Sequence, residues 1–288
     1  MSTDADTTEA SGQLITAAEV MARLDDPTVR LIDASFELMD PQAGKRLYAA
    51  GHIPGAVHLD LDRDLSSEPG ARGRHPLPDM QLLAIKLGDS GIGNDHEIVV
   101  YDQDGGMFAA RAWWLLRHAG HDAVRFLDGG VAEYVRIGGH LDANEPLHAP
   151  TTFTLAVAHD MIVTGDEVHQ RLNDPTLVLL DARAPERYRG EVEPLDAKAG
   201  HIPGARNLHY TAALEEGRLL APSRLAETLR TSELAGADVV AYCGSGVSAA
   251  HLILALEVAG LPGVRLYPGS WSEWSADPDR PVAGSSED

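Results

Sequence analysis

Short apolar runs alternate with longer segments of helical character along most of this chain. The short runs are rich in β-branched residues and have the length of buried strands. The longer segments have the length and apolar content of helices. Strands are predicted over 29–33, 97–101 and 238–242, and helices over 80–87, 111–118 and 249–256. Because the two kinds of segment alternate, we predict an α/β protein whose parallel sheets carry helices on both faces.

Several segments of the first half recur in the second half at a nearly constant spacing. Residues 15–20 recur with similar character at 163–168, and the sequence Gly-His-Ile-Pro-Gly-Ala at 51–56 recurs unchanged at 200–205. A period this long is typical of a duplicated globular domain and not of a solenoid. We therefore expect a disordered tail, a first domain, a proline-containing linker and a second domain, over 1–12, 13–144, 145–158 and 159–288.

Composition narrows the classes of function. The formal net charge of −21 argues against nucleic-acid binding, because phosphate repels an acidic surface. No apolar stretch is long enough to span a bilayer, and the acidic N-terminus lacks the features of a signal peptide. The chain has 1 cysteine, which permits no internal disulfide and fits a reducing compartment. We expect a cytoplasmic protein with neither membrane nor nucleic-acid partners.

The single cysteine, Cys243, is the strongest candidate for a catalytic residue. It opens the run Cys-Gly-Ser-Gly-Val-Ser at 243–248, between the strand predicted over 238–242 and the helix predicted over 249–256. Glycines let backbone N–H groups converge on one point, and a helix N-terminus adds positive potential there. Both effects favour the thiolate, which is the reactive form of cysteine. A buried structural cysteine is the alternative, but such a residue needs no glycine-rich loop.

The first half lacks this chemistry at the matching position. Tyr101-Asp102 aligns with Tyr242-Cys243, so a carboxylate stands where the second half has its thiol. A carboxylate does not perform thiolate chemistry. We therefore expect the second domain to react, and the first domain to support it and to line the cleft, since ligand pockets are common between domains.

Taken together, several segments resemble the tandem-domain rhodanese family of sulfurtransferases. They are the Cys243–Ser248 run, both Gly-His-Ile-Pro-Gly-Ala segments, and residues 127–130 and 267–274. The resemblance covers nearly the whole chain and implies two tandem rhodanese-like domains, each a parallel five-stranded sheet flanked by helices. It also implies a reaction in which the cysteine takes a sulfane sulfur from a small donor, becomes a persulfide, and passes the sulfur to cyanide or a thiol. Such a two-step transfer is nucleophilic catalysis with ping-pong kinetics and requires no metal or organic cofactor.

The same resemblance assigns roles to individual residues. It implies catalytic roles for Cys243, Ser245 and Asp62, and substrate-binding roles for Arg187, His75, Gly244, Gly246, Val247 and Ser248. In the mercaptopyruvate branch of the family, a loop serine and an aspartate of the first domain form a relay with the cysteine. The alternative for Asp62 is an exposed loop carboxylate without a role. Arg187 suits a donor carboxylate because guanidinium binds planar anions in a fork geometry.

The identity of the sulfur donor is left open by the loop and its surroundings. The Cys243–Ser248 loop carries no charged residue, as in the mercaptopyruvate branch. That branch has a second arginine after a Glu-Pro pair, whereas here the pair at 193–194 is followed by Leu195 and Asp196. Lys198 and Arg206 are candidate replacements. We therefore keep 3-mercaptopyruvate and thiosulfate as donors, with a thiosulfate-specific enzyme as the alternative.

Other kinds of function are less well supported by the residues. A cysteine-dependent phosphatase requires an arginine where this chain has Ala249. A persulfide carrier that serves one protein partner, without turnover of small donors, stays open. His52 and His201 suggest a metal site, but they occupy equivalent turns of separate repeats, so we expect structural roles and no metal. Thioredoxin is a candidate thiol acceptor, and the two-domain layout favours a monomer.

Overall fold

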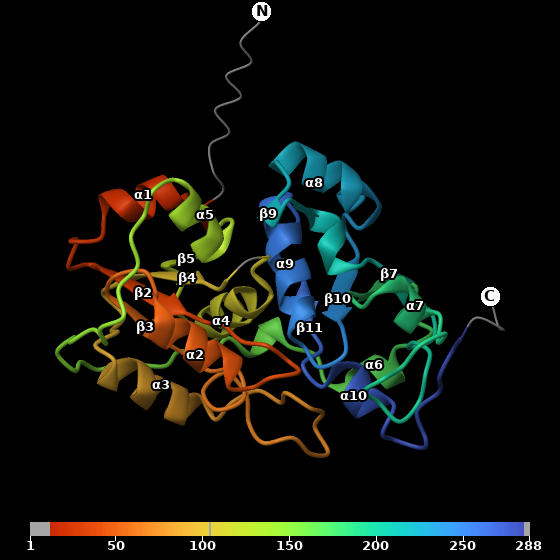
Figure 1. Cartoon of the computed structure of the whole chain (residues 1–288). Coiled ribbons are helices and arrows are strands. Elements are labelled where there is room, and N and C mark those ends of the chain that lie inside the picture. Colours follow the sequence, from red (N-terminus) through yellow and green to blue (C-terminus); the bar gives the residue numbers. More distant parts are fainter. Residues whose placement is uncertain (1–11, 104, 285–288) are drawn as a thin grey trace, which may run out of the picture.

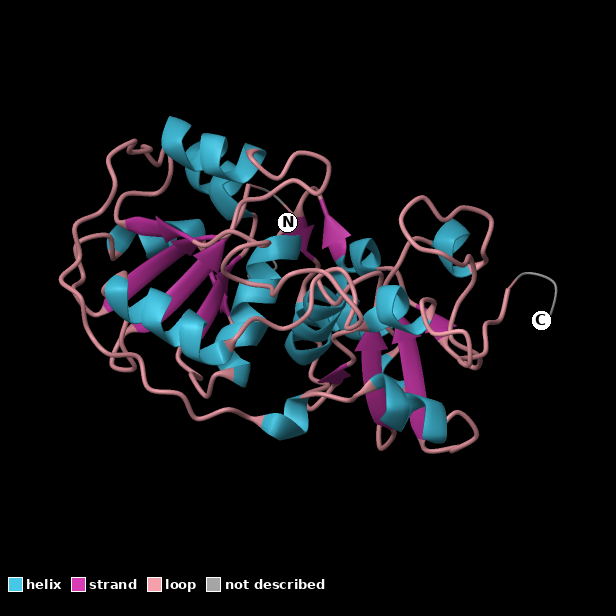
Figure 2. Cartoon of the chain, turned by 90° about the horizontal axis from the view of Figure 1, so that it is seen from below, coloured by secondary structure: helices cyan, strands magenta, loops and turns pink. Residues whose placement is uncertain are grey.

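The computed structural model describes residues 12–103 and 105–284. Apart from Gly12, the disordered tail expected over 1–12 lies outside the described residues. Figure 1 shows two halves side by side, each built around its own sheet, and Figure 2 shows the two groups of strands with helices around and between them. This arrangement agrees with the duplication seen in the sequence.

The first half contains a five-stranded sheet in which every neighbouring pair is parallel, in the order β1-β5-β4-β2-β3. Its strands are β1 Leu14–Ile15, β2 Val29–Asp33, β3 Ala56–His58, β4 Glu97–Tyr101 and β5 Val124–Leu127. Its helices are α1 Ala17–Ala22, α2 Ala43–Ala50, α3 Met80–Asp89, α4 Met107–His118 and α5 Gly130–Arg136. The strands predicted over 29–33 and 97–101 are confirmed, and both predicted helices fall within longer observed ones.

The second half repeats this plan around a sheet in the order β11-β10-β6-β7, also parallel. Its strands are β6 Leu177–Asp181, β7 Arg206–Asn207, β10 Asp238–Tyr242 and β11 Arg265–Leu266, and β8 Leu214–Glu215 pairs with β9 Arg218–Leu219 in an antiparallel hairpin. Its helices are α6 Gly165–Gln170, α7 Pro185–Tyr188, α8 Pro222–Thr228, α9 Ser248–Val258 and α10 Ser270–Trp274. Single 3₁₀ turns are η1 His159–Met161, η2 Tyr210–Ala213 and η3 Thr231–Glu233.

The second sheet differs from the prediction of five strands, because it has four. In the first half, β1 pairs with β5 over two residues. The counterpart in the second half is a single parallel bridge between Ile162 and Leu266. The 3₁₀ turn η1 ends at Met161, directly before the bridge, and β11 is only two residues long, so little extended backbone is available to form a ladder.

One hydrophobic core runs through both halves. Helices α4 and α9 pack against each other between the two sheets, as Figure 1 shows. Buried side chains of both helices, among them Trp113, Trp114 and Leu252, belong to this shared core. Each sheet buries its other face in a separate, smaller cluster. Because the inner faces share a core, the halves are held together by the hydrophobic effect as well as by polar contacts.

The segment expected as a linker, 145–158, forms no helix or strand. It is nevertheless attached to the first half through its backbone. The amides of Thr151 and Ala156 donate to the carbonyls of Gly88 and Ala119, and Phe153 is buried. The segment therefore runs along the first half and is held there by hydrogen bonds and by the buried Phe153.

The duplicated histidines occupy equivalent structural positions, as expected. His52 stacks on Tyr48 with ring centroids 3.9 Å apart, and His201 stacks on Tyr188 at 3.8 Å. The Nδ1 atom of each histidine contacts the carbonyl of the tyrosine on which it stacks, at 2.9 and 2.8 Å. Each histidine therefore stabilises the turn of its own half, and the two do not share one site.

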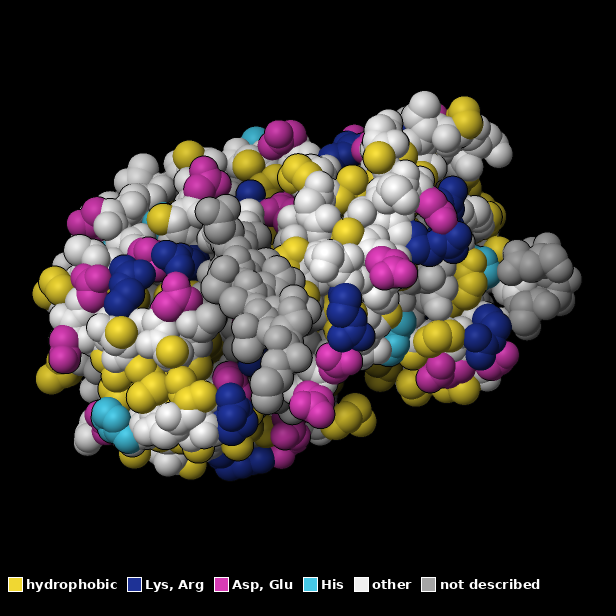
Figure 3. All heavy atoms as spheres, turned by 90° about the horizontal axis from the view of Figure 1, so that it is seen from above, with side chains coloured by type: hydrophobic (Ala, Val, Ile, Leu, Met, Phe, Trp, Pro, Cys, Tyr) yellow, Lys and Arg dark blue, Asp and Glu magenta, His cyan; other side chains and the backbone are white. Residues whose placement is uncertain are grey.

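The helices and the surface charge indicate which classes of partner the protein can bind. No helix among the described residues has the length and apolar character required to cross a membrane. Figure 3 shows basic side chains lying among acidic ones on one face, so the described part of that face has no continuous basic patch.

Candidate functional site

The candidate nucleophile lies in the turn between strand β10 and helix α9. Strand β10 ends at Tyr242 and α9 begins at Ser248. Between them the chain reverses through Gly246, whose φ of 79° lies in the left-handed region that glycine adopts without strain. The Gly246 N–H donates to Cys243 Sγ at 3.1 Å. This is the kind of main-chain donor that stabilises a thiolate next to a helix N-terminus.

The turn is fixed by the segment that begins helix α10. The Cys243 amide donates to Ser270 Oγ at 3.1 Å. The carbonyls of Cys243 and Gly244 accept from the amides of Trp271 and Ser272, each at 2.9 Å. Ser270 holds a φ of 54°, a conformation that costs energy for a residue with a side chain. Its hydroxyl is therefore placed under the nucleophile at some cost in backbone strain.

Cys243 is more deeply buried than we expected. The glycine-rich loop favoured a reactive thiol over a buried structural one, whereas only 2 % of the residue is exposed. The cause is the first half, whose side chains cover the Cys243–Ser248 loop, as the next contacts show. In this conformation little of the residue is in contact with solvent.

Three of the predicted residues lie in a row that starts in the first half and ends in the loop. Ser245 Oγ is 2.7 Å from His75 Nδ1, and His75 Nε2 is 3.4 Å from Asp62 Oδ1. Burial, together with the charges of Arg111 and Arg74, lowers the pKa of His75 to about 4, so this ring is neutral at neutral pH. A neutral ring that accepts from the Ser245 hydroxyl at Nδ1 carries its proton on Nε2, which faces Asp62.

Asp62 itself is about half exposed, with a side-chain exposure of 48 %. Burial raises its pKa, and the charges of Asp60 and Glu68 act in the same direction. The carboxylate is thus near the solvent end of the row, and Ser245 is at the buried end. The geometry permits a proton to pass between the loop and solvent along these groups.

Arg111 places a positive charge against the loop from the first half. The residue lies on α4 and is fully buried. Its guanidinium donates to the carbonyls of Gly246, Leu65 and His75 at 3.3, 3.4 and 3.2 Å. Burial lowers the pKa of Arg111 to about 10, and the charge of Cys243 acts in the opposite direction. The guanidinium therefore places a buried positive charge against the backbone of the Cys243–Ser248 loop.

Arg187, predicted to bind the donor, lies beside the loop but is paired with carboxylates. It contacts Glu193 at 2.7 Å and Asp196 at 3.3 Å. Asp196 also pairs with Arg74 of the first half, and burial raises its pKa although both arginines act in the opposite direction. The sequence therefore led to the correct segment for Arg187 but did not indicate these partners.

The two candidate replacements for a second arginine lie elsewhere. Lys198 Nζ donates to the carbonyl of Asp277 at 3.0 Å. Arg206 is on strand β7 and is exposed. Within the part of the chain that the structure describes, neither side chain forms a hydrogen bond or an ion pair with the Cys243–Ser248 loop, so the structure offers no support for them as donor-binding residues. The remaining loop residues differ in exposure, because Val247 is buried whereas Ser248 begins α9 and is partly exposed.

Two arginines near the loop were missed by sequence reasoning. Arg111 had a detectable signal, since it is a lone charge in an otherwise apolar helical segment. Arg74 directly precedes His75, which was a predicted site residue, so its position in the sequence was a signal. Nothing in the sequence, however, indicates that either residue contacts the second half.

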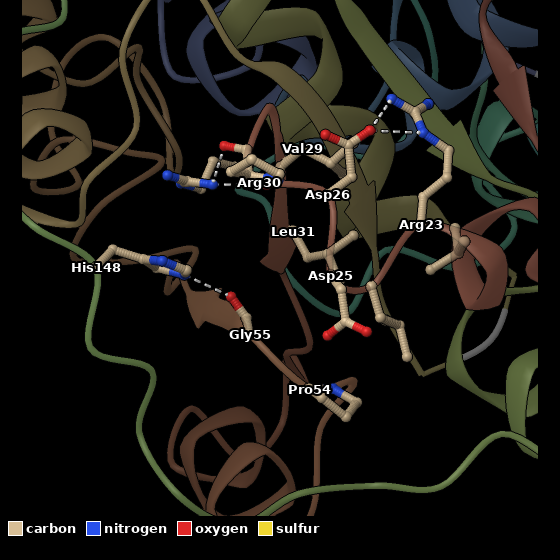
Figure 4. Close-up of a pocket in the computed structure, with 12 residues that line it drawn as sticks. Arg23, Asp25, Asp26, Val29, Arg30, Leu31, Pro54, Gly55 and His148 are labelled. Atoms are coloured by element: carbon tan, nitrogen blue, oxygen red, sulfur yellow. Dashed lines mark hydrogen bonds and ion pairs between the residues drawn. The ribbon is translucent and has the colours of Figure 1, made fainter.

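Two further features of the described residues lie apart from this site or give it no additional ligand. Among the described residues, no group of three or more His, Cys, Asp or Glu side chains is arranged to hold a metal ion. Figure 4 shows a hollow in the first half around Arg23, Arg30 and His148, near the start of strand β2. None of its lining residues belongs to the Cys243–Ser248 loop. Its polar groups are engaged locally, as in the contact of His148 with the Gly55 carbonyl at 2.9 Å.

Comparisons with known proteins agree with this picture. A model of the rhodanese-like domain matches residues 16–137 and 164–277, one match in each half. The chain is 47 % identical over 281 residues to a probable 3-mercaptopyruvate sulfurtransferase of Pseudomonas aeruginosa, covering 95 % of this chain and 99 % of that protein. It is 43 % identical over 283 residues to a putative thiosulfate sulfurtransferase, SseB, of Mycobacterium tuberculosis, covering 95 % and 98 %.

A solved structure is similar over nearly the same length. The crystal structure of SseA from Escherichia coli, described as a 3-mercaptopyruvate sulfotransferase, superposes with a TM-score of 0.81 at 32 % identity. The match covers 91 % of this chain and 100 % of that one. The similarity therefore includes both halves and the interface on which the site lies.

Proposed function

Since the chain belongs to the family of proteins with rhodanese-like domains and is a sulfurtransferase, we propose that Cys243 carries the transferred sulfur as a persulfide. The observation that supports this most directly is the contact between the Gly246 N–H and Cys243 Sγ at 3.1 Å. It aligns the only sulfhydryl of the chain with a main-chain donor in the turn before α9. The buried charge of Arg111 supports an anionic sulfur at the same place.

The proposed first step forms one S–S bond and breaks one bond in the donor. With 3-mercaptopyruvate, the thiolate attacks the donor sulfur and the electron pair of the carbon–sulfur bond stays on carbon. The proton of the donor's thiol is transferred to that carbon, and pyruvate leaves. With thiosulfate, the sulfur–sulfur electron pair leaves with sulfite and no proton is needed. In the second step cyanide or a thiol takes the outer sulfur and the Cys243 thiolate returns.

We propose that Ser245, His75 and Asp62 handle the proton of the first step. Because the ring of His75 is neutral at neutral pH, the row accepts and donates a proton without leaving a buried charge. Glycines 244 and 246 let the loop backbone approach the donor, and Val247 and Ser248 complete its wall. A small thiol, cyanide or thioredoxin is the proposed acceptor, and a monomer in the cytoplasm is the proposed setting.

The decisive experiment is intact-mass analysis of the protein before and after incubation with each donor. We expect a gain of one sulfur atom, which cyanide removes with formation of an equal amount of thiocyanate. Protein whose single thiol has first been blocked with iodoacetamide is the control and should gain nothing. An unblocked protein that turns over donor without gaining sulfur would contradict the persulfide.

A steady-state assay separates an enzyme from a carrier. We expect repeated turnover with small donors and cyanide. A single loading without turnover would instead support the alternative of a persulfide carrier that serves one protein partner.

A further inference from the structure

One buried guanidinium is bonded to the backbone of both halves at the point where their side chains meet. Arg111, on α4, donates from Nη1 to the Gly246 carbonyl of the second half at 3.3 Å. From Nη2 it donates to the His75 carbonyl of the first half at 3.2 Å. Gly246 directly follows Ser245, and the side chains of Ser245 and His75 meet at 2.7 Å. The guanidinium therefore joins the two backbone segments that carry the partners of this hydrogen bond.

The same guanidinium also binds the turn that carries Asp62. Arg111 Nη2 donates to the Leu65 carbonyl at 3.4 Å, and the Leu65 amide donates to the Asp60 carbonyl at 3.0 Å. Asp62 lies inside the turn that this bond closes, and its amide donates to Asp60 Oδ1 at 3.0 Å. Each residue of the row from Asp62 to the loop is therefore close in sequence to a carbonyl that Arg111 binds.

The repeat shows that the fold does not require an arginine at this position. Tyr101 aligns with Tyr242, which places Leu252 of α9 at the position that Arg111 has in α4. Leu252 is fully buried in the shared core. Arg111 instead brings a charge into the core, and burial lowers its pKa to about 10.

The buried charge of Arg111 is also poorly compensated. Among the described residues it forms no ion pair with a carboxylate, and its Nε has no hydrogen-bond partner. Burying a cation without a carboxylate partner costs stability. A residue that costs stability, at a position where the other half has leucine, is better explained by the site than by packing.

We propose that Arg111 is the positioning residue of the relay formed by Ser245, His75 and Asp62. Its planar guanidinium binds the backbone beside each of the three, and so it holds their side chains in line although they come from two halves. This inference rests on the proton transfer proposed above and names the group that assembles it. A lysine would keep the charge but not these contacts, because an ammonium is a point charge on a flexible stem.

The same helix offers a matched control. Arg117 also lies on α4 and also reaches the second half, where it pairs with Glu257 of α9. Its guanidinium lies over the Trp113 ring, 4.9 Å from the centroid. Within the described residues it has no hydrogen bond to the Cys243–Ser248 loop. Arg117→Leu therefore removes an equal charge and a contact between the halves, and it leaves the relay untouched.

The first test measures the hydrogen bond between Ser245 and His75 and does not depend on sulfur transfer. In the wild-type protein, Ser245→Ala should lower the folding equilibrium constant about fivefold, as expected for one hydrogen bond. In an Arg111→Leu background the same change should lower it by less than about twofold, because the two side chains are no longer held together. In an Arg117→Leu background the loss should stay about fivefold. Urea unfolding of the single and double variants gives these values.

The unfolding comparison also defines what contradicts the proposal. A loss of about fivefold in every background would overturn it. If Arg111→Leu does not fold, Arg111→Lys takes its place in the same comparison, with the same expected result. If neither variant folds, Arg111 is required by the fold itself, and the proposal is again overturned.

The second test uses the reaction. Arg111→Lys should lower kcat with 3-mercaptopyruvate about tenfold and leave KM within about twofold of wild type, because the relay moves a proton and does not bind the donor. The loss of kcat with thiosulfate should be less than about threefold, since that transfer needs no proton. Arg117→Leu should leave both kcat values within about twofold of wild type.

Equal losses of kcat with both donors would assign Arg111 to the general structure of the loop and overturn the proposal. Should the protein transfer no sulfur, the unfolding comparison still decides whether Arg111 positions Ser245 and His75. Failure of the proposed function and failure of this inference are therefore distinct.

Discussion

The turns after β4 and β10 occupy the same place in the two halves and hold different side chains that accept from backbone amides. In the first half, the carboxylate of Asp102 accepts from the amides of Gly106, Phe108 and Ala109 at 3.1, 3.0 and 3.1 Å. In the second half, Cys243 Sγ accepts from the amide of Gly246 at 3.1 Å. In both cases the turn leads directly into a long helix, α4 or α9.

This difference teaches that the fold itself supplies the anion site. A strand that ends just before a helix presents free N–H groups at its carboxyl end, whatever side chain follows. In the first half a carboxylate occupies those groups permanently and acts as a helix cap. In the second half a sulfur takes that place, and its looser hold leaves it available for reaction.

The segments beneath the two turns differ in the same sense. Gly130 and Ser270 hold nearly the same positive φ, 57° and 54°. Glycine adopts this conformation freely, whereas serine is strained in it. The serine hydroxyl gives an acceptor to the Cys243 amide at 3.1 Å. The second half therefore has a strained residue, Ser270, where the first half has an unstrained glycine. The Ser270 hydroxyl holds the backbone of Cys243 in place.

The largest expected effect follows from making the second turn like the first. Cys243→Asp places a carboxylate where the N–H of Gly246 and the charge of Arg111 favour an anion. Sulfur transfer should fall by more than about a thousandfold, while the free energy of unfolding changes by less than about 1 kcal/mol. Activity and urea unfolding are measured on the same preparation, with Cys243→Ala as a control. A Cys243→Asp variant that still transfers sulfur would show that another group is the nucleophile.

The converse change tests the role of the first turn. Asp102→Ala removes the acceptor of three buried or partly buried amides and should lower the free energy of unfolding by about 2 kcal/mol. Asp102→Asn keeps one acceptor and should lose less. Denaturant unfolding gives both values, and kcat should stay within about twofold of wild type. If Asp102→Ala is as stable as wild type, the carboxylate is not a cap.

The smallest expected effect concerns the proton relay, through which the first half takes part in the chemistry. Asp62→Asn should lower kcat about tenfold with 3-mercaptopyruvate and less with thiosulfate, because only the former needs a proton on the leaving carbon. Burial raises the pKa of Asp62, so its charged fraction falls as the pH drops through that raised value. The wild-type kcat should therefore decline in acid with mercaptopyruvate, and this decline should be absent in Asp62→Asn. Equal losses with both donors would exclude the relay.

Much of the fold could be predicted from local patterns in the sequence. The strands β2, β4 and β10 coincide with runs rich in apolar residues, because a strand covered on both faces buries most of its side chains. The repeats revealed the two halves before any element was placed. The absence of a fifth strand from the second sheet could not be predicted, since Ile162 and Leu266 look like strand residues. The neighbouring 3₁₀ turn and the two-residue β11 limit them to one bridge.

The site could be predicted from the sequence only in part, because it lies between the two halves. Cys243 and its loop could be found because they lie within one strand–turn–helix unit. The contacts of Arg74 and Arg111 with that loop depend on how α4 and α9 pack, which no local periodicity encodes. The burial of Cys243 had the same origin, because the covering residues lie far away in the sequence.

The burial of the single thiol has a consequence for the lifetime of the loaded protein. A chain with 1 cysteine has no second thiol that could attack its own persulfide and release hydrogen sulfide. With only 2 % of Cys243 exposed, encounters with oxidants and stray thiols are also restricted. If Cys243 carries the sulfur as proposed, the rate at which that sulfur is discharged is set by the supply of an external acceptor.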